Sequence, residues 1–135
     1  MRSIARKTIT AGATLVLAMS GAVLAAGPAS AATNCYASGC NGLDPAATTC
    51  ADDAVTVSTS GSLELRYSPS CRAAWGRDRY SVPGELLTVT NSAGQSYGVS
   101  SPSGGPLWTR MVNDADLTSQ AKDTTANGWE RTGSY

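Results

Sequence analysis

Four cysteines are the residues with the most evident chemistry in this sequence of 135 residues, and they stand at Cys35, Cys40, Cys50 and Cys71. An even number of cysteines in a small exported domain indicates disulfides. Zinc is the alternative. The spacings of four, nine and twenty intervening residues lack the paired C-x-x-C knuckles of a zinc ribbon, and the sequence contains no histidine. The sequence therefore predicts two disulfides and no metal.

The absence of histidine also excludes the Ser-His-Asp and Cys-His arrangements of nucleophilic catalysis. A serine–lysine pair would have to use Lys122, in a polar segment where nothing indicates desolvation. The remaining option is a carboxylate pair, and a glycosidase needs its two acids about 5–10 Å apart. Glu64 and Glu85 are the candidates, but Glu64 alternates with Arg66 on an expected solvated face. We therefore expect no enzyme activity and no cofactor.

The segment Asn113–Thr118 places oxygen ligands at alternate positions, as a calcium loop does. It lacks the glycine at the sixth position and the closing glutamate of that loop. A turn with solvated acids is the preferred interpretation.

Three residues are candidates for binding. Trp108 follows a Gly-Gly-Pro loop, and an exposed tryptophan on a flat β-face can act as a platform on which sugars stack. Glu64 and Arg66 form a charged face on a neighbouring segment. Either surface would suit a non-catalytic binding module.

The first 31 residues read as a secretory signal peptide. Basic residues precede an apolar run over Ile9–Ala26, and Ala29-Ser30-Ala31 provides the small-residue cleavage pattern. A retained membrane anchor is the alternative, disfavoured because polar residues and glycines interrupt the run. We expect a secreted, extracellular chain that begins at Ala32 and has no membrane contact after cleavage.

The predicted mature chain has 104 residues, which suffices for one domain. Seven basic and ten acidic residues remain once the three basic residues of the leader are removed, a formal charge of −3. This balance argues against nucleic acid as a partner.

The densest pattern in the chain is Leu63–Trp75. Alternation of apolar and polar residues predicts a half-buried strand at Leu63–Ser68, with its leucines inward, and a turn at Pro69. Cys71, Ala73 and Trp75 resume the alternation on a returning strand with Trp75 buried. Val55–Ser58 should pair with the first strand as a hairpin.

Further along the chain, Gly76–Gly84 reads as a loop, and a second hairpin spans Leu87–Val99 around the turn Asn91-Ser92-Ala93-Gly94. Leu107–Val112 is a predicted sixth strand. Beyond Leu117 the chain is polar, so residues 32–118 form the predicted domain and 119–135 a polar tail, with a small hairpin at Asn127-Gly128 as an option.

Asp44 before Pro45 is a helix start, and it predicts a short helix that ends near Cys50. The fold class is thus all-β and mainly antiparallel: a small single-domain sandwich or partly open barrel with one short helix and two disulfides. Three disulfide pairings are open. A fold-back of the chain at Leu43-Asp44 favours Cys40–Cys50, which leaves Cys35–Cys71.

Three sequence stretches resemble YjfA-like proteins, an exported bacterial domain family of unknown function found as small secreted proteins of actinomycetes. The stretches are Cys-Asn-Gly-Leu-Asp-Pro-Ala-Ala-Thr-Thr-Cys, Leu-Glu-Leu-Arg-Tyr-Ser-Pro-Ser-Cys-Arg-Ala-Ala-Trp and Met-Val-Asn-Asp-Ala. The resemblance spans about Cys35–Leu117. It implies a secreted β-rich module, sometimes appended to membrane-tethered helix-turn-helix regulators, and it brings no catalytic residues.

We therefore expect a non-catalytic extracellular or cell-envelope binding module, with a cell-wall polymer or an envelope protein as its partner. The alternative is a small secreted inhibitor of an extracellular hydrolase, which fits the size and the disulfides but rests on no inhibitory motif.

Overall fold

Two antiparallel sheets contain all nine strands of the part of the chain that the computed structural model describes, residues 32–125 and 128–135. The strands are β1 (Val55–Ser60), β2 (Leu63–Ser68), β3 (Ala73–Ser81), β4 (Leu86–Asn91), β5 (Ser96–Ser100), β6 (Gly105–Trp108), β7 (Val112–Asn113), β8 (Ser119–Thr125) and β9 (Gly128–Arg131).

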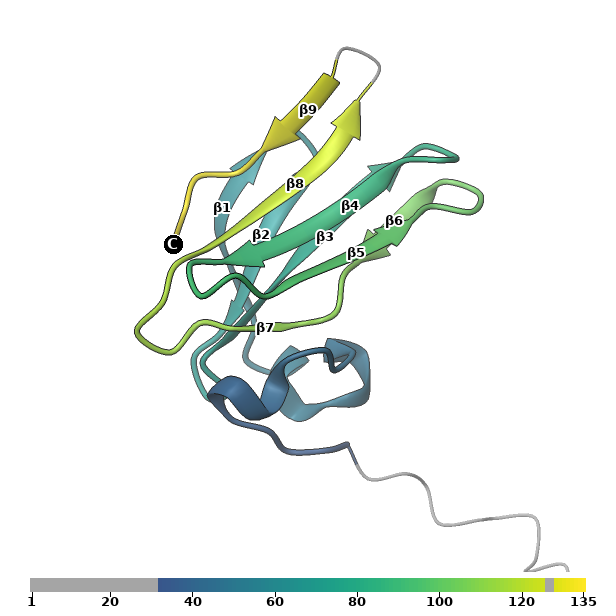
Figure 1. Ribbon diagram of the computed structural model, residues 1–135. Coiled ribbons are helices and arrows are strands. Elements are labelled where there is room, and N and C mark those ends of the chain that lie inside the picture. Colours follow the sequence, from purple (N-terminus) through teal and green to yellow (C-terminus); the bar gives the residue numbers. More distant parts are fainter. Residues whose placement is uncertain (1–31, 126–127) are drawn as a thin grey trace, which may run out of the picture. The chain divides into compact units, whose positions relative to one another are not determined.

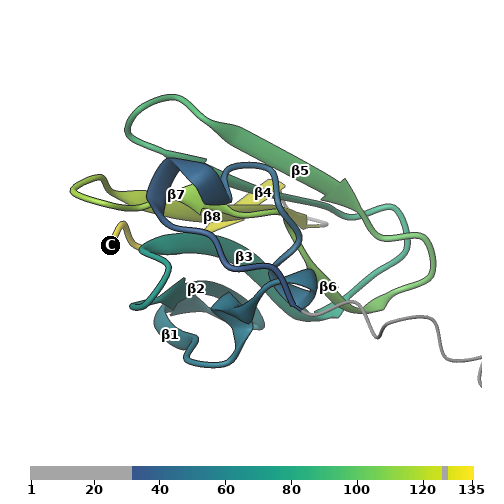
Figure 2. The same cartoon turned by 90° about the horizontal axis from the view of Figure 1, so that it is seen from below.

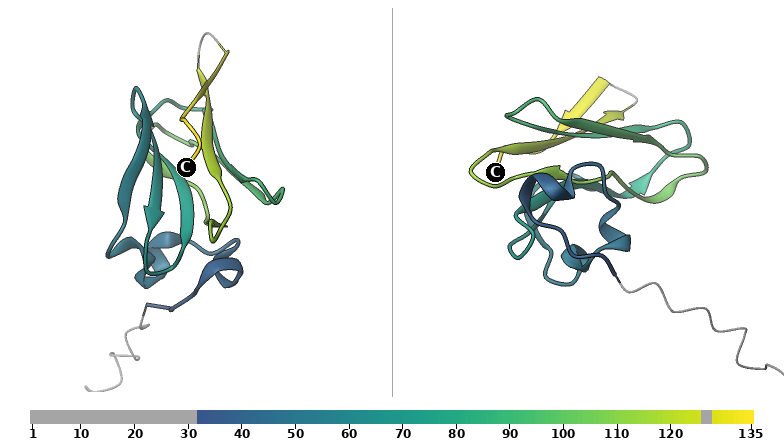
Figure 3. Two further views of the ribbon diagram at one scale, coloured as in Figure 1. Left: turned by 90° about the vertical axis from the view of Figure 1, so that its left-hand side faces the viewer. Right: turned by 60° about the horizontal axis from the view of Figure 1, so that its bottom comes forward.

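The first sheet has the strand order β1-β2-β3-β6, with β7 also pairing with β3, and the second has the order β5-β4-β8-β9 (Figure 1). The left panel of Figure 3 shows the sheets edge-on as two layers. They do not close into a barrel. The predicted all-β fold is confirmed, in its sandwich form.

The predicted signal peptide lies outside the described residues, and among those described no helix is long and apolar enough to cross a membrane.

The main core lies between the two sheets. Leu63 and Leu65 on β2 are fully buried, as their alternation predicts, and they pack with Leu87 and Val89 of β4. Each such side chain contributes about 1.5–3 kcal/mol by leaving water. This cluster joins the two sheets.

The sheets approach each other closely at Gly76, which lies opposite Leu65 in the β2–β3 register. A Cβ atom at Gly76 would lie 3.2 Å from the Cβ of Ala121 and 3.4 Å from Leu87 Cδ1. Only a residue without a side chain fits this position without displacing the second sheet.

A second core covers the outer face of the first sheet. It contains Trp75, Ala73 and Met111 together with three of the cysteines. Trp75 is buried as predicted, but it faces away from the inter-sheet core, because Trp75 lies opposite Arg66 and its neighbour Gly76 lies opposite Leu65. The start of β3 is therefore buried on both faces.

The loop predicted over Gly76–Gly84 is wrong. β3 continues through Arg77, Asp78 and Arg79 to Ser81. Polarity alone predicts a loop here because charged residues occupy the middle of the strand. In the structure, Glu64 of β2 pairs with both Arg77 and Arg79.

Three single-turn 3₁₀ helices, η2 (Ala37–Cys40), η3 (Pro45–Ala47) and η4 (Thr49–Ala51), form the segment before β1. Asp44 caps η3 as predicted, since its Oδ1 accepts the Ala46 N–H at 2.9 Å. The single helix predicted up to Cys50 is wrong. Thr48 has an extended backbone (φ −125°, ψ 166°) and its hydroxyl caps η4, so the helix is broken into two turns.

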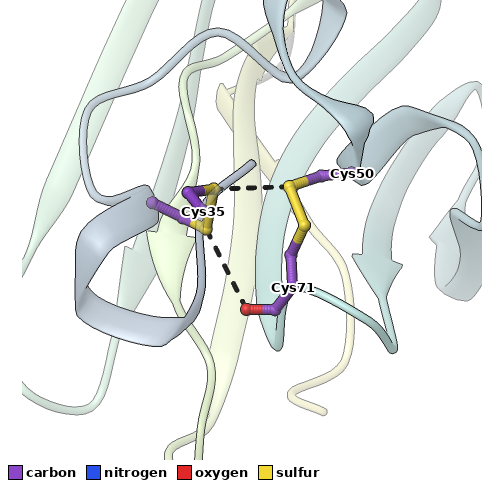
Figure 4. A group of neighbouring side chains, drawn as sticks. Cys35, Cys50 and Cys71 are labelled. Atoms are coloured by element: carbon purple, nitrogen blue, oxygen red, sulfur yellow. Dashed lines mark hydrogen bonds between the residues drawn. A yellow bond between two sulfur atoms is a disulfide. The ribbon is translucent and has the colours of Figure 1, made fainter. Parts of the chain in front are cut away.

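The disulfides are Cys35–Cys40 and Cys50–Cys71, so the predicted pairing of Cys40 with Cys50 and Cys35 with Cys71 is wrong (Figure 4). η2 folds the chain back within five residues, which brings the Cα atoms of Cys35 and Cys40 to 5.1 Å. The Sγ atoms of Cys35 and Cys50 are also only 3.4 Å apart. All four sulfurs lie within 4.8 Å of one another, so they form one cluster.

The 3₁₀ segment, blue in Figure 2, lies at one end of the sandwich. The disulfide Cys50–Cys71 links this segment to the β2–β3 turn. No cysteine among the described residues is free, as the sequence predicts.

The segment predicted as a polar tail belongs to the same compact unit as the rest of residues 32–135. Its strand β8 lies between β4 and β9, with Ala121 opposite Val89. The optional terminal hairpin is present as β8–β9. The predicted sixth strand is split into β6 and β7, and between them the Gly76 N–H donates to the Thr109 hydroxyl in place of a backbone carbonyl.

Candidate functional site

All three predicted binding residues lie on the outer face of the first sheet. Glu64 stands opposite Arg77, and Arg77 stands opposite Trp108, so these side chains share one face across β2, β3 and β6. Arg66 lies on the same face of β2, two residues from Glu64. The structure thus gathers on one surface residues that are more than 40 positions apart in the sequence.

Trp108 is the centre of this surface. It is 42% exposed on the edge strand β6, and its indole Nε1 donates a hydrogen bond of 3.0 Å to Asp44 Oδ1. The same oxygen accepts the Ala46 N–H that caps η3. The carboxylate therefore fixes the orientation of the ring and leaves part of the indole open to solvent.

A hollow of about 200 Å³ adjoins Trp108 between the sheet and the 3₁₀ segment. Its lining combines apolar residues and two arginines: Pro45, Ala46, Ala51, Arg66, Trp75, Arg77 and Trp108. Two further depressions border Trp108, and Asp44 lines both. The indole thus stands where several surface recesses meet.

Arg66 is the arginine in the lining of the hollow that could bind an anionic group, because Arg77 is paired with Glu64. Its guanidinium donates to Thr56 Oγ1 at 2.8 Å and to the Ala54 carbonyl at 3.2 Å, and within the described residues it forms no ion pair. Burial, followed by the charge of Arg77, lowers the pKa of Arg66. Since an arginine stays protonated in proteins, the group presents a fixed positive charge.

Glu64 is not solvated, contrary to the prediction. It is only 6% exposed, and its carboxylate pairs with Arg77 Nε and, at 3.7 Å, with Arg79 Nε. The cause is the continuation of β3, which places these two arginines beside β2 instead of in a loop. Glu64 therefore holds Arg77 at the hollow and presents little surface to a ligand.

The acids Glu64 and Glu85 do not meet. Glu64 points to the outer face, whereas Glu85 lies near Asp78, which faces the second sheet opposite Leu63. The carboxylate pair considered for a glycosidase, and disfavoured from the sequence, is therefore not formed by these two residues.

The acids of the calcium-like loop have protein partners. Asp116 forms an ion pair with Arg72 at 2.8 Å, and Asp114 accepts the Ser119 hydroxyl at 2.7 Å. Asp114 is buried rather than solvated, and burial raises its pKa.

The ammonium of Lys122, the residue considered for a serine–lysine pair, lies 5.2 Å from the ring centre of Trp129.

Asp44 and Arg77 were missed as parts of the binding surface. The Asp-Pro signal identifies Asp44 as a helix cap and says nothing of a contact with Trp108, 64 residues away. The polarity of residues 76–84 predicts a loop around Arg77, and a loop has no strand register that would place Arg77 beside Glu64.

Fold and surface together define a disulfide-stabilised β-sandwich with a fixed tryptophan at the edge of one sheet. The chain belongs to the family described as "Protein of unknown function (DUF2690)", whose profile matches residues 38–122, from η2 into β8. Comparison with curated proteins found no match, and comparison with solved structures found none either.

Proposed function

We propose that this protein is a secreted, non-catalytic module that binds a sugar-containing polymer of the cell wall through the surface around Trp108. The observation that carries the proposal is an exposed indole anchored by Asp44 beside a hollow that holds Arg66. The kinship with YjfA-like exported proteins of actinomycetes is part of the same proposal.

The anchored indole supports sugar binding because its ring is ordered before a ligand arrives. Pre-ordering reduces the entropy lost on binding, which costs about 0.5–1.5 kcal/mol for each side chain that must be immobilised. An aromatic ring with a polar edge gives a large apolar contact area together with a hydrogen-bonding rim. Asp44 supplies an acceptor at that rim, and Arg66 supplies donors.

The dimensions of the hollow favour part of a polymer over an enclosed small molecule. Its volume of about 200 Å³ is below the roughly 300–1,000 Å³ of typical small-molecule sites. One ring or side branch of a longer chain fits such a recess. The arginines favour a polymer that carries acidic groups, such as peptidoglycan.

Two observations support export. Both disulfides join residues of the described domain, and disulfides persist in oxidising compartments. The signal-like sequence of residues 1–31 is consistent with the same route.

Sedimentation with purified peptidoglycan tests the proposal, with Trp129 as the matched control. Trp129 is 53% exposed but belongs to β9 of the second sheet. Trp108→Ala should weaken binding about tenfold or more, the effect of removing a central aromatic contact. Trp129→Ala should bind as the wild type does.

Equal binding by both variants would refute the role of Trp108. If the wild type does not sediment with the polymer but inhibits an extracellular hydrolase, the inhibitor alternative replaces the binding module. Thermal unfolding of each variant controls for loss of structure.

A further inference from the structure

Three buried carboxyl groups meet between the two sheets, on the opposite side of the first sheet from Trp108. Asp78 comes from β3, Glu85 from the β3–β4 connection and Asp123 from β8. They are 3%, 7% and 2% exposed, respectively. One oxygen from each lies within 4.8 Å of an oxygen from each of the others. From the sequence, Asp78 falls in a predicted loop, Glu85 just before a predicted strand and Asp123 in the predicted polar tail.

Two oxygens of this trio lack hydrogen-bond donors. Glu85 Oε2 accepts the Val82 N–H at 2.9 Å, and Asp78 Oδ1 accepts the Tyr80 N–H at 2.8 Å. Glu85 Oε1 and Asp123 Oδ1 are enclosed, and no donor in the described part of the chain reaches them. A buried carboxylate oxygen without a donor loses its hydration and gains nothing in return, at a cost of about 1–3 kcal/mol or more.

The trio also lacks a protein cation. Within residues 32–125 and 128–135, no lysine or arginine forms an ion pair with any of the three acids. Burial first, and then the neighbouring Asp78, raise the pKa of Glu85 and of Asp123, the latter to about 7. Burial also raises the pKa of Asp78, but hydrogen bonds with Glu85 and Ser62 and from Tyr80 hold it below its ordinary value.

Three buried acids without a protein cation are neutralised either by protons or by a bound cation. We propose that Asp78, Glu85 and Asp123 bind a hard divalent cation, with Ca²⁺ as the ion that best fits their all-oxygen ligand set. Calcium–oxygen distances of about 2.3–2.6 Å place ligands on opposite sides of the ion about 4.6–5.2 Å apart. The separations within the trio do not exceed this span.

The three acids lie in the lining of a depression of about 230 Å³. Ser62 and Glu130 lie in the same lining. Their oxygens, with water, can complete the six to eight ligands that calcium takes. A bound ion would connect β3 to β8, and so join the two sheets at a point where like charges now face one another.

Calorimetric titration of the EDTA-treated protein with CaCl₂, MgCl₂ and MnCl₂ tests this site. We expect Ca²⁺ to bind with a Kd of about 10⁻⁴–10⁻³ M or tighter, in the range of extracellular calcium modules. Asp123→Asn and Glu85→Gln should each weaken binding at least about tenfold, because each removes a ligand charge. Asp116→Asn is the matched control, since Asp116 is an acid outside the trio and 90% exposed.

Thermal unfolding adds a second measurement. Calcium should raise the Tm of the wild type and of Asp116→Asn. It should leave the Tm of Asp123→Asn unchanged. The ion-free Asp123→Asn protein should unfold cooperatively, which separates loss of the site from loss of the fold. Preferential binding of Mg²⁺ or Mn²⁺ with the same variant pattern would keep the cation site and change only the ion.

The proposal would be overturned if none of the three ions bound, or if Asp123→Asn bound the ion and gained Tm as the wild type does. The acids would then be neutralised by protons alone. The outcome is independent of the peptidoglycan experiment, because Trp108 and the trio lie on opposite faces of the first sheet.

Discussion

Removal of the two disulfides should destabilise the protein by different amounts. Cys50 and Cys71 are 21 residues apart in sequence, whereas Cys35 and Cys40 are five apart. In the chain-entropy treatment, loops of these lengths correspond to stabilisation of about 3.3 and about 2.1 kcal/mol at 25 °C. The double variant Cys50→Ala/Cys71→Ala should therefore lose about 1 kcal/mol more than Cys35→Ala/Cys40→Ala.

Packing acts in the same direction as the loop lengths. Cys50 and Cys71 are both buried in the second core, whereas Cys35 is only partly buried. Truncation of two buried side chains leaves the larger void, which adds to the cost. Cys50–Cys71 also connects the 3₁₀ segment to the β2–β3 turn, so its loss releases a longer stretch of chain.

Urea unfolding under non-reducing conditions, followed by the fluorescence of the tryptophans, measures both double variants against the wild type. The slopes of the transitions should be compared, because a disulfide also changes the compactness of the unfolded state. Equal destabilisation, or a larger loss in Cys35→Ala/Cys40→Ala, would refute the reasoning. So would a non-reduced digest in which Cys40 is linked to Cys50.

Three further predictions concern the sandwich itself. Leu65→Ala should cost about 2–5 kcal/mol in chemical unfolding, since it empties a site in the inter-sheet core. Gly76→Ala should cost about 1–3 kcal/mol, because the new methyl group would meet Ala121 at 3.2 Å; an unchanged midpoint would contradict the close approach of the sheets. Hydrogen bonds, first that from the Ser68 hydroxyl, lower the pKa of Asp53, so its stabilisation is present above the unfolded pKa of 3.8 and is lost as pH falls through the folded value. Unfolding measured from neutral to acidic pH should show this loss in the wild type and a smaller one in Asp53→Asn.

Much of the local structure is determined by the sequence alone. The alternation around Leu65 identifies β2 and its buried face, because successive side chains on a strand point to opposite sides. The turn residues after Asn91 identify the β4–β5 hairpin, where the Asn91 side chain accepts the N–H groups of Ala93 and Gln95. Both signals are contained within a few residues.

Tertiary structure decided the rest. β8 carries no apolar run, and its burial follows from its place between β4 and β9. The sequence does not determine the disulfide pairing, because all four sulfurs lie in one cluster and each has more than one neighbour within reach. The binding surface of Trp108 with Asp44 joins residues 64 positions apart, and the carboxyl trio of Asp78, Glu85 and Asp123 joins different strands across the sandwich. Such sites arise from strand register and sheet packing, which depend on contacts between distant segments and leave no periodic signal in the sequence.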